Sequence, residues 1–496
     1  MGRLVKMKKS TYLFLLVLLF FFKVQAQVYS PFSQSNFAGI YGVSQNPSFT
    51  ALDKHSWHLN LIGAGINANN NYLRLDMPYS PYRAINDKIP RQYQTASGNP
   101  DFRKSWLLRK VSTRPKHASA QAHIMGPSLL IKVKSWKLGL VTEGYGNARA
   151  FSIDRKLADI VYLEFDSAAG AYDQAIKESY RGGDINTKGG TLAGSGYAAI
   201  GFHASRAWDL QWNQKISAGI TPKLAFGGGF GGLSYSDFDI TSLFNDSFRI
   251  SKFSAESRYS QERRIAFATD IGVTYVYNKP TPRQSGNYRK NKTKYHSKIG
   301  LAILNIGRFK YNANFTSVES SSAISLAKSD FDNLNTGDAD SGASQLFENY
   351  GVVNQSIKRT KVGLPTVLHI SVDHQVRQNI FVATSWVQSL RKRNSYHMRQ
   401  QSYLLVTPRY ETKHWEVGIP LGLLYDYRSL RMGLYARFGP LFIGTHSLNG
   451  FLNTRNASDA DFFIGISVGR IGKPKSKIER EKENLKQDGG NKCDDF

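Results

Sequence analysis

Apolar and polar residues alternate strictly between positions 415 and 443, in two runs separated by a polar break at 425–429. The apolar positions are Trp415, Val417, Ile419, Leu421 and Leu423 in the first run and Leu430, Met432, Leu434, Ala436 and Phe438 in the second. A period of two predicts two β-strands, each with one apolar face. The opposite faces carry glycine and charged residues, which cannot line a dry core. An apolar outside and a polar inside are typical of a transmembrane barrel, where lipid takes the place of the core.

The same period recurs along most of the chain. We expect strands at 57–66, 70–77, 118–150, 196–206, 214–226, 265–277, 299–311, 365–374, 378–389, 401–410 and 415–443, with a last strand at 462–468. Since a spanning strand takes roughly 9–11 residues, the pattern predicts about 14 strands, within a range of about 12 to 16. The predicted fold is therefore all-β, a transmembrane antiparallel β-barrel over residues 57–469.

Three long segments interrupt the strands, at about 78–117, 151–193 and 317–362. Structureless connections of this length are unusual in a compact soluble domain but ordinary in the external loops of a barrel. Apolar residues at helical spacing predict one or two short helices within 153–180 and another near 343–354. The first loop is rich in basic residues. It either binds phosphate groups of lipopolysaccharide or is a solvated loop without a ligand.

The N-terminus has the parts of a secretory signal peptide. Residues 1–9 are basic, residues 11–22 are almost entirely apolar, and a small-residue cleavage site ends at Ala26. We therefore expect residues 1–26 to be removed and the mature chain to reach the outer membrane. The segment 470–496 is highly charged and has no apolar period, which predicts a disordered periplasmic tail.

Three short phrases stand out against this pattern. They are the Asn46-Pro47 motif within 42–51, the phrase Gly-Leu-x-Ile-Leu-Asn-Ile-Gly within 299–311, and the phrase Phe-Gly-Pro-Leu-Phe-Ile-Gly at 438–444. With them the chain resembles FadL-type outer-membrane barrels and their relatives in gliding, type IX-secreting bacteria, the PorV and PorP/SprF-like proteins. The last phrase is similar to the end of an uncharacterised family in this group.

The resemblance implies that the segment 27–56, with Asn46 and Pro47, folds into the lumen as a hatch. Ser48 departs from the alanine that is usual at its position. The alternative is an Asn-Pro turn that leads into the first strand.

Charged residues on the polar faces of the strands are the candidate lumen residues. They are Lys132, Lys134, Lys137, Lys223, Asp270, Asp373, Glu416, Arg431 and Arg437. Lysines on a polar strand face need water around them, which a barrel lumen supplies. Opposite charges across a wet lumen indicate either an ion-pair network that plugs the barrel or a route for an anionic or amphipathic solute. The alternative is a set of solvated residues without a further function.

Pro222, Gly439 and Pro440 are candidate strand kinks, because a proline within a strand removes a hydrogen bond from the ladder. In FadL-type transporters a kinked strand opens a lateral exit for hydrophobic substrates, and the resemblance implies the same for the Gly439-Pro440 pair. The alternative is an ordinary bulge near the rim of the barrel.

The sequence contains no recognisable catalytic or metal-binding motif. His55 and His58 are three positions apart, which on a regular strand places them on opposite faces. The glycine run 227–232 matches G-x-G-x-x-G, but a strand follows it instead of the helix that a dinucleotide site requires, so we interpret it as a turn. The only cysteine is Cys493. We therefore expect no enzymatic activity, no cofactor and no metal site.

The formal net charge of +28 indicates anionic partners. For an exported chain these are outer-membrane lipid and lipopolysaccharide rather than nucleic acid. The resemblance leaves two functions open. The first is the passage of hydrophobic or amphipathic small molecules across the outer membrane. The alternative is a non-transporting structural barrel that associates with proteins of a type IX secretion or gliding machinery.

Overall fold

The computed structural model of the protein describes residues 30–79, 89–94, 106–110, 112–159, 184–211, 213–243, 247–251, 253–278, 295–319, 324–327, 352–448 and 458–471. The expected signal segment with its cleavage after Ala26, most of the helices expected in the long loops, and the tail beyond Ile471 lie outside the described residues. Of the helix expected after residue 153, residues 155–159 are described and are helical.

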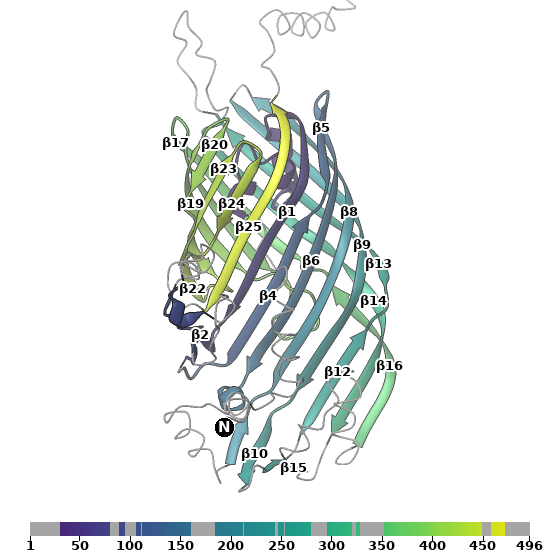
Figure 1. Ribbon diagram of the computed structural model, residues 1–496. Coiled ribbons are helices and arrows are strands. Elements are labelled where there is room, and N and C mark those ends of the chain that lie inside the picture. The colour runs from purple at the N-terminus through teal and green to yellow at the C-terminus, as the bar shows by residue number, and fades with distance from the viewer. Residues whose placement is uncertain are drawn as a thin grey trace, which may run out of the picture.

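A single closed ring of fourteen antiparallel segments forms the body of the molecule (Figure 1). In order around the ring they are β1 (His55–Asn70), β4 (Lys116–Met125) with β5 (Ser128–Val133), β6 (Trp136–Ile153), β8 (Gly190–Gln211), β9 (Gln214–Tyr235), β12 (Ser254–Ser260) with β13 (Arg264–Tyr277), β14 (Ser297–Glu319), β16 (Val352–Gly363) with β17 (Val367–Arg377), β18 (Ile380–Ser389), β19 (Tyr403–Glu411), β20 (Trp415–Gly418) with β21 (Leu421–Leu424), β22 (Ser429–Met432) with β23 (Leu434–Phe438), β24 (Leu441–Thr445) and β25 (Asp459–Ile471). The last strand pairs with the first, which closes the ring. The predicted all-β barrel of about 14 strands is confirmed.

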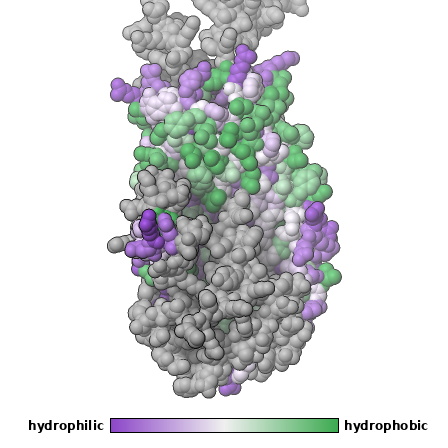
Figure 2. Space-filling view, viewed as in Figure 1, coloured by the Kyte–Doolittle hydropathy of each residue, from purple (hydrophilic) through white to green (hydrophobic). Residues whose placement is uncertain are grey.

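The outer surface of the ring is apolar over a broad band. Large apolar side chains point outward at every second position, and on β13 Ile265 and Phe267 are 65% and 84% exposed. Figure 2 shows the apolar residues gathered in one zone of the visible face, with hydrophilic residues at its edge. Exposing such side chains to water is unfavourable by about 25 cal/mol per Å² of apolar area. The band is therefore the surface that meets acyl chains.

The wall is much taller on one side of the barrel than on the other. β8, β9 and β14 contain 22, 22 and 23 residues, whereas β18 and β19 contain 10 and 9. At about 3.3 Å per residue, the longest strands exceed what a hydrocarbon core of roughly 30 Å requires, even when they are tilted. These strands extend well past the short side of the ring in Figure 1.

The two ends of the barrel differ in their connections. Two-residue turns join β5 to β6, β17 to β18 and β23 to β24 at one end. The other end carries the hairpin of β2 (Leu73–Leu75) and β3 (Leu107–Arg109), and a four-stranded sheet of β7 (Asp184–Thr187), β10 (Phe238–Leu243), β11 (Ser247–Ser251) and β15 (Ile324–Ala327). Bacterial barrels have short periplasmic turns and longer external loops. We therefore assign the end with the short turns to the periplasm.

Gly439 and Pro440 form one of these two-residue turns and are not a kink within a strand. Phe438 pairs with Leu441 across the turn, and Gly439 has a φ of +56°, a conformation that favours glycine. The expected kink at this pair was wrong, because apolar residues continue on both sides of the turn and conceal it. Lys134, with a φ of +52°, lies in the β5–β6 turn.

The glycine run 227–232 lies inside β9, which continues to Tyr235. The interpretation of this run as a turn was wrong. Gly232 faces inward, and a Cβ there would collide with the ring of Tyr396, so glycine makes room for a side chain in the lumen. Helices are few, and none within the described ranges is long and apolar enough to cross a membrane.

Candidate functional site in the barrel lumen

The segment Ser30–Lys54 lies inside the barrel near its periplasmic end (Figure 1), and we call it the plug. It contains α2 (Ser30–Ser33), η1 (Gly39–Ser44) and η2 (Pro47–Leu52), and it adds no strand to the ring. Most of its residues are buried. Asn46 caps η2 by accepting hydrogen bonds from the Ser48 backbone N–H (2.9 Å) and hydroxyl (2.6 Å). Pro47 takes the first helical position, where no backbone N–H is needed.

The Asn46-Pro47 motif also docks the plug on the wall. Nδ2 of Asn46 donates hydrogen bonds to the backbone carbonyls of Val273 (3.2 Å) and Leu301 (3.3 Å). The facing wall position on β9 is Gly219, where an added Cβ would lie 2.5 Å from the carbonyl carbon of Pro47. The motif therefore fits because the wall carries no side chain at the point of contact.

Side chains further along the plug reach other strands. The hydroxyl of Ser48 lies 2.5 Å from that of Thr274 on β13, and the hydroxyl of Thr50 lies 2.6 Å from Nε2 of His203 on β8. At the other end of the plug, the ring of Phe32 stacks on Phe442 of β24 at 4.5 Å. The plug thus contacts the wall on several sides through both polar and apolar groups.

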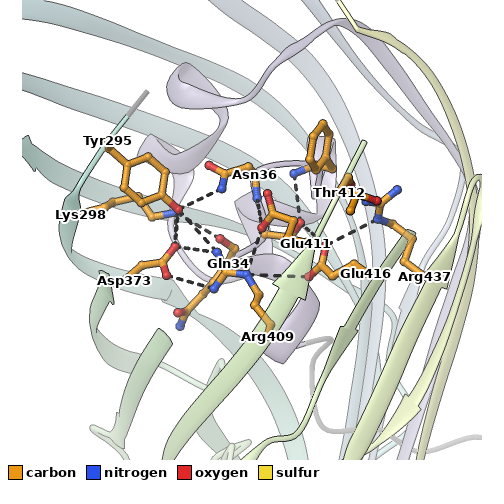
Figure 3. Close-up of polar contacts among 12 residues, drawn as sticks. Gln34, Asn36, Tyr295, Lys298, Asp373, Arg409, Glu411, Thr412, Glu416 and Arg437 are labelled. Carbon is orange, nitrogen blue, oxygen red and sulfur yellow. Dashed lines mark hydrogen bonds and ion pairs between the residues drawn. The ribbon is translucent and has the colours of Figure 1, made fainter. Parts of the chain in front are cut away.

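A group of buried charges lies beside the plug, and we call it the Arg409 cluster (Figure 3). The guanidinium of Arg409 donates hydrogen bonds to both carboxylate oxygens of Asp373, at 3.0 and 2.8 Å, and to Glu411 at 3.0 Å. Lys298 lies 3.3 Å from Asp373, and Arg437 lies 3.6 Å from Glu416. Three basic and three acidic side chains therefore lie together in a buried space, where each needs its partners.

The plug takes part in this cluster through Gln34, Ser35 and Asn36. The hydroxyl of Ser35 donates to Glu416 at 2.6 Å, and the backbone N–H of Asn36 donates to Glu411 at 3.3 Å. The carbonyl of Gln34 accepts a hydrogen bond from Lys298 at 3.1 Å. The charges thus fix the plug as well as each other.

Tyr295, which lies outside the strands, connects the two sides of the cluster. Its hydroxyl donates to Asp373 at 2.5 Å and accepts from the Asn36 side chain at 3.1 Å. Burial and the negative charge of Asp373 raise the pKa of Tyr295 well above its ordinary value. The phenol therefore stays protonated and acts as a donor to the carboxylate.

A second group of buried charges surrounds Lys223 of β9. Its Nζ lies 2.8 Å from Glu143 and 2.7 Å from Asp270, and it donates to the side-chain oxygen of Asn305 at 3.1 Å. Asn305 has a φ of +55° at a bulge between β13 and β14. Next to Lys223, Pro222 points outward, and the pairing of β9 with β8 is interrupted there without a shift in register.

The remaining candidate residues lie apart from these two groups. Lys132 and Lys134 are exposed at the periplasmic rim and do not line the lumen, because the hairpin that carries them ends there. Lys137 points inward, donates a hydrogen bond to the His55 carbonyl, and lies 4.0 Å from Asp53 of the plug. Arg431 lies near the extracellular end, 2.9 Å from Asp459.

Burial by itself would raise the pKa of Asp53, but His55 and Lys137 more than offset this effect and hold the pKa below its usual value. His55 and His58 both face the lumen, with ring centroids 4.7 Å apart, because a bulge between His55 and Trp57 shifts the register. Their expected placement on opposite faces was wrong. Within the described part of the chain, no group of three or more histidine, cysteine or acidic residues is arranged to hold a metal ion.

The connection Leu390–Ser402 between β18 and β19 also enters the lumen, from the extracellular side, and we call it the strap. Arg399 donates two hydrogen bonds to Asp426, at 2.8 and 2.6 Å. The Arg149 side chain donates a hydrogen bond to the His397 carbonyl at 2.9 Å. Met398 is fully buried in an apolar cluster on the inner wall. Burial alone would raise the pKa of Asp426, but the hydrogen bonds and positive charge of Arg399 lower it by more. The pKa of Asp426 is therefore below its ordinary value.

Sequence reasoning did not single out the strap. Its residues are mostly polar and basic, as in any exposed connection. The signals that could have indicated it are the lone Met398 and Tyr396 within this polar stretch, together with the inward-facing Gly232 that accommodates the tyrosine ring.

The fold and the filled lumen define a class of protein, the outer-membrane β-barrels with an internal plug. The chain belongs to the family described as "Family of unknown function (DUF5723)", which it matches over residues 47–446. The expected membership of an uncharacterised barrel family is thereby confirmed.

Several solved structures are similar to the chain in fold. The TodX deltaS2S3 mutant monoaromatic hydrocarbon channel has 8% sequence identity and a TM-score of 0.36, over 88% of this chain and 95% of that chain. The Pseudomonas putida toluene transporter TodX has 8% identity and a TM-score of 0.31, over 88% and 94%. A Pseudomonas aeruginosa FadL homologue has 12% identity and a TM-score of 0.30, over 85% and 90%. A comparison with curated protein sequences gave no match.

Proposed function

We propose that the chain forms a gated passage through the outer membrane for hydrophobic or amphipathic small molecules. The observation that carries this proposal is that the ring of strands closes without any strand from the plug. β1 and β25 close the barrel by pairing with each other, and the plug adds no strand. Moving the plug therefore costs side-chain contacts but leaves every hydrogen bond between strands in place.

The inner wall offers a surface that suits an apolar solute. Tyr145, Tyr197, Phe230, Phe309 and Tyr311 belong to one inward-facing apolar cluster. The strap covers this cluster with Met398 and Tyr396. Displacement of the strap uncovers aromatic rings inside the barrel, where most wall positions are polar, and such a surface favours apolar and amphipathic molecules over ions.

A disulfide that locks the plug tests the proposal. Ser48 and Thr274 are suitable positions because their hydroxyl oxygens are 2.5 Å apart, within the reach of a disulfide. The variant Ser48→Cys/Thr274→Cys is made in a Cys493→Ser background and reconstituted in vesicles. We expect entry of an apolar fluorescent dye to be slow after oxidation and to recover on reduction.

The matched control is Val372→Cys/Thr384→Cys, which joins β17 to β18 at a directly paired position on the outer face of the wall. This crosslink does not reach the plug, so dye entry should not depend on its redox state. Equal entry through the locked and reduced forms would contradict the proposal. Entry no faster than into vesicles without protein would contradict it as well.

A second candidate function is a structural role, in which the barrel is a platform for other proteins. The observation in its favour is the tall wall, together with the external sheet whose outer strands are β7 and β15. Strands at the edge of a sheet offer unpaired backbone groups to a partner. Crosslinking in native membranes followed by mass spectrometry tests this role. A defined partner linked through the external sheet, with no dye entry in vesicles, would favour the platform over the passage.

A further inference from the structure

A cavity of about 790 Å³ lies at the extracellular end of the ring, and none of its lining residues belongs to the plug or the strap. It is bounded by the ends of β1 and β4, by the β2–β3 hairpin, and by the connection between β21 and β22. Asn69, Tyr425 and Asp459 line it with inward-facing, buried side chains. These side chains place the cavity at the extracellular mouth of the barrel.

The lining of this cavity is strongly basic. Five basic residues come from the hairpin and the start of β4, namely Arg74, Arg109, Lys110, Arg114 and Lys116. Arg428 and Arg431 come from the opposite side, and among the described residues of the lining Asp459 is the only acidic one. Near low-dielectric walls these positive charges repel one another strongly and create a positive potential in the cavity. That potential attracts anions.

Few of these cations are neutralised by the protein. Among the described residues, Arg109 pairs with Asp159 at 3.1 Å and Arg431 with Asp459 at 2.9 Å. Arg74, Lys110 and Arg114 have no acidic group within 4.0 Å in the same set of residues. Nε of Arg74 is also buried without a hydrogen-bond partner there. A buried donor of this kind calls for an acceptor that the described part of the chain does not supply.

The remaining two cations are held by uncharged groups. Nζ of Lys116 donates to the Ser112 carbonyl at 2.9 Å. Arg428 donates to Nδ1 of His117 at 2.8 Å and lies over the ring of Phe151 at 5.1 Å. Burial, together with the nearby Arg431, lowers the pKa of Lys110. An anion placed between these groups would relieve both the repulsion and the missing hydrogen bonds.

We infer that this cavity binds a sugar that carries two or more phosphate groups. Guanidinium groups match phosphate oxygens with paired donors, and lysine adds positive charge without a fixed geometry. Cations on two opposite sides suit a ligand with separated anionic groups. Three asparagines and four serines in the lining offer neutral donors and acceptors for hydroxyl groups. The volume is in the range of small-molecule sites and exceeds what a single inorganic anion fills.

Two sources supply this chemistry at the cell surface. One is a soluble phosphorylated sugar, and the other is the phosphorylated sugar headgroup of an outer-leaflet glycolipid. The inference does not depend on the proposed passage, because no residue of the plug or the strap lines the cavity.

Calorimetric titration of the purified full chain in uncharged detergent tests the inference. The probes are fructose 1,6-bisphosphate, with glucose as its neutral counterpart, and nanodiscs that contain either bisphosphorylated or dephosphorylated lipid A. We expect saturable binding of at least one phosphorylated probe, and none of its neutral counterpart. Binding should weaken at high salt, because charges in an open cavity are screened over about 10 Å at 0.1 M ionic strength.

The variant Arg74→Gln/Lys110→Gln should weaken binding about tenfold or more, since it removes two charge-assisted contacts. The control Lys132→Gln/Lys134→Gln removes the same charge from the opposite rim and should change binding less than about twofold. If the first variant does not fold, Arg114→Gln at an exposed position of the lining replaces it. The absence of binding to both phosphorylated probes, or an equal loss in cavity and rim variants, would overturn the inference.

Discussion

Arg409 is the residue whose replacement should destabilise the barrel most clearly, and Arg409→Met is the informative change. Methionine keeps most of the side-chain length but removes the charge and every donor. Arg409 and its partners Asp373 and Glu411 have side chains that are 0–1% exposed. The substitution therefore leaves carboxylates without their main partner in a place that water does not reach.

The magnitude follows from the contacts. Three charge-assisted hydrogen bonds are lost, each with a net contribution of about 1.5–3 kcal/mol. Removal of one partner from a buried ion pair typically costs about 3–5 kcal/mol. Lys298 remains 3.3 Å from Asp373 and offsets part of the loss. We therefore expect the free energy of unfolding to fall by about 3 kcal/mol, the lower limit of this range.

Equilibrium urea unfolding of the refolded barrel in phospholipid, followed by tryptophan fluorescence, measures this free energy. Arg377→Met, at an exposed position on the rim, is the control and should stay within about 0.5 kcal/mol of the parent. The double variant Arg409→Met/Asp373→Asn should cost clearly less than the two single variants together, because it removes opposite charges at once. A cost below about 1 kcal/mol for Arg409→Met, or strict additivity, would refute the reasoning.

Three further predictions concern the plug, the strap and the lipid face. Gly219→Ala should loosen the plug, because the added Cβ would lie 2.5 Å from the plug backbone, and a protease should then cleave the plug faster. The control is Gly231→Ala, whose added Cβ meets nothing within 4 Å and which should leave the cleavage rate unchanged. Because the pKa of Asp426 is lowered, its pairing with Arg399 stabilises the strap above about pH 4, and this stabilisation is lost as the pH falls through the lowered pKa. Pepsin should then cut the strap at low pH. A strap that resists pepsin equally at every pH would contradict this. Phe267→Arg, at an 84% exposed lipid-facing position, should cost about 2–4 kcal/mol in phospholipid but much less in detergent, and an equal cost in both would argue against a bilayer-facing surface.

The alternation of apolar and polar residues predicted the ring because it reports one local property, the side of the strand on which each residue lies. The same reasoning predicted inward charges such as Lys223, Asp373 and Glu416, which are buried in the lumen. The alternation did not show which charged side chains contact one another. Arg409, the central residue of one cluster, was not selected, because its three carboxylate contacts bring together β17, β19 and the plug-facing start of β20 only in the folded barrel.

Turns and inserts were harder to predict than strands. Gly439-Pro440 and Lys134 occupy tight turns that do not interrupt the apolar pattern. The strap was missed for the opposite reason, because a basic, polar segment predicts exposure, and only the fold places Arg399 opposite Asp426. Local patterns therefore indicated the wall, whereas the contents of the lumen depend on contacts between residues far apart in the chain.

The position of the plug before the first strand has a consequence for how the barrel is assembled. β24 and β25 pair over only four positions, from Leu441–Ile466 to Gly444–Phe463, whereas β25 pairs with β1 over thirteen where the ring closes, so the junction with few backbone bonds lies one strand before the closure. Phe32 and Tyr41 of the plug pack on Phe442 at this junction. Because the plug directly precedes β1 in the chain and packs on β24, it links the first strand to a late strand on the inner side of the barrel. Closure of the ring and enclosure of the plug would thus be coupled during assembly.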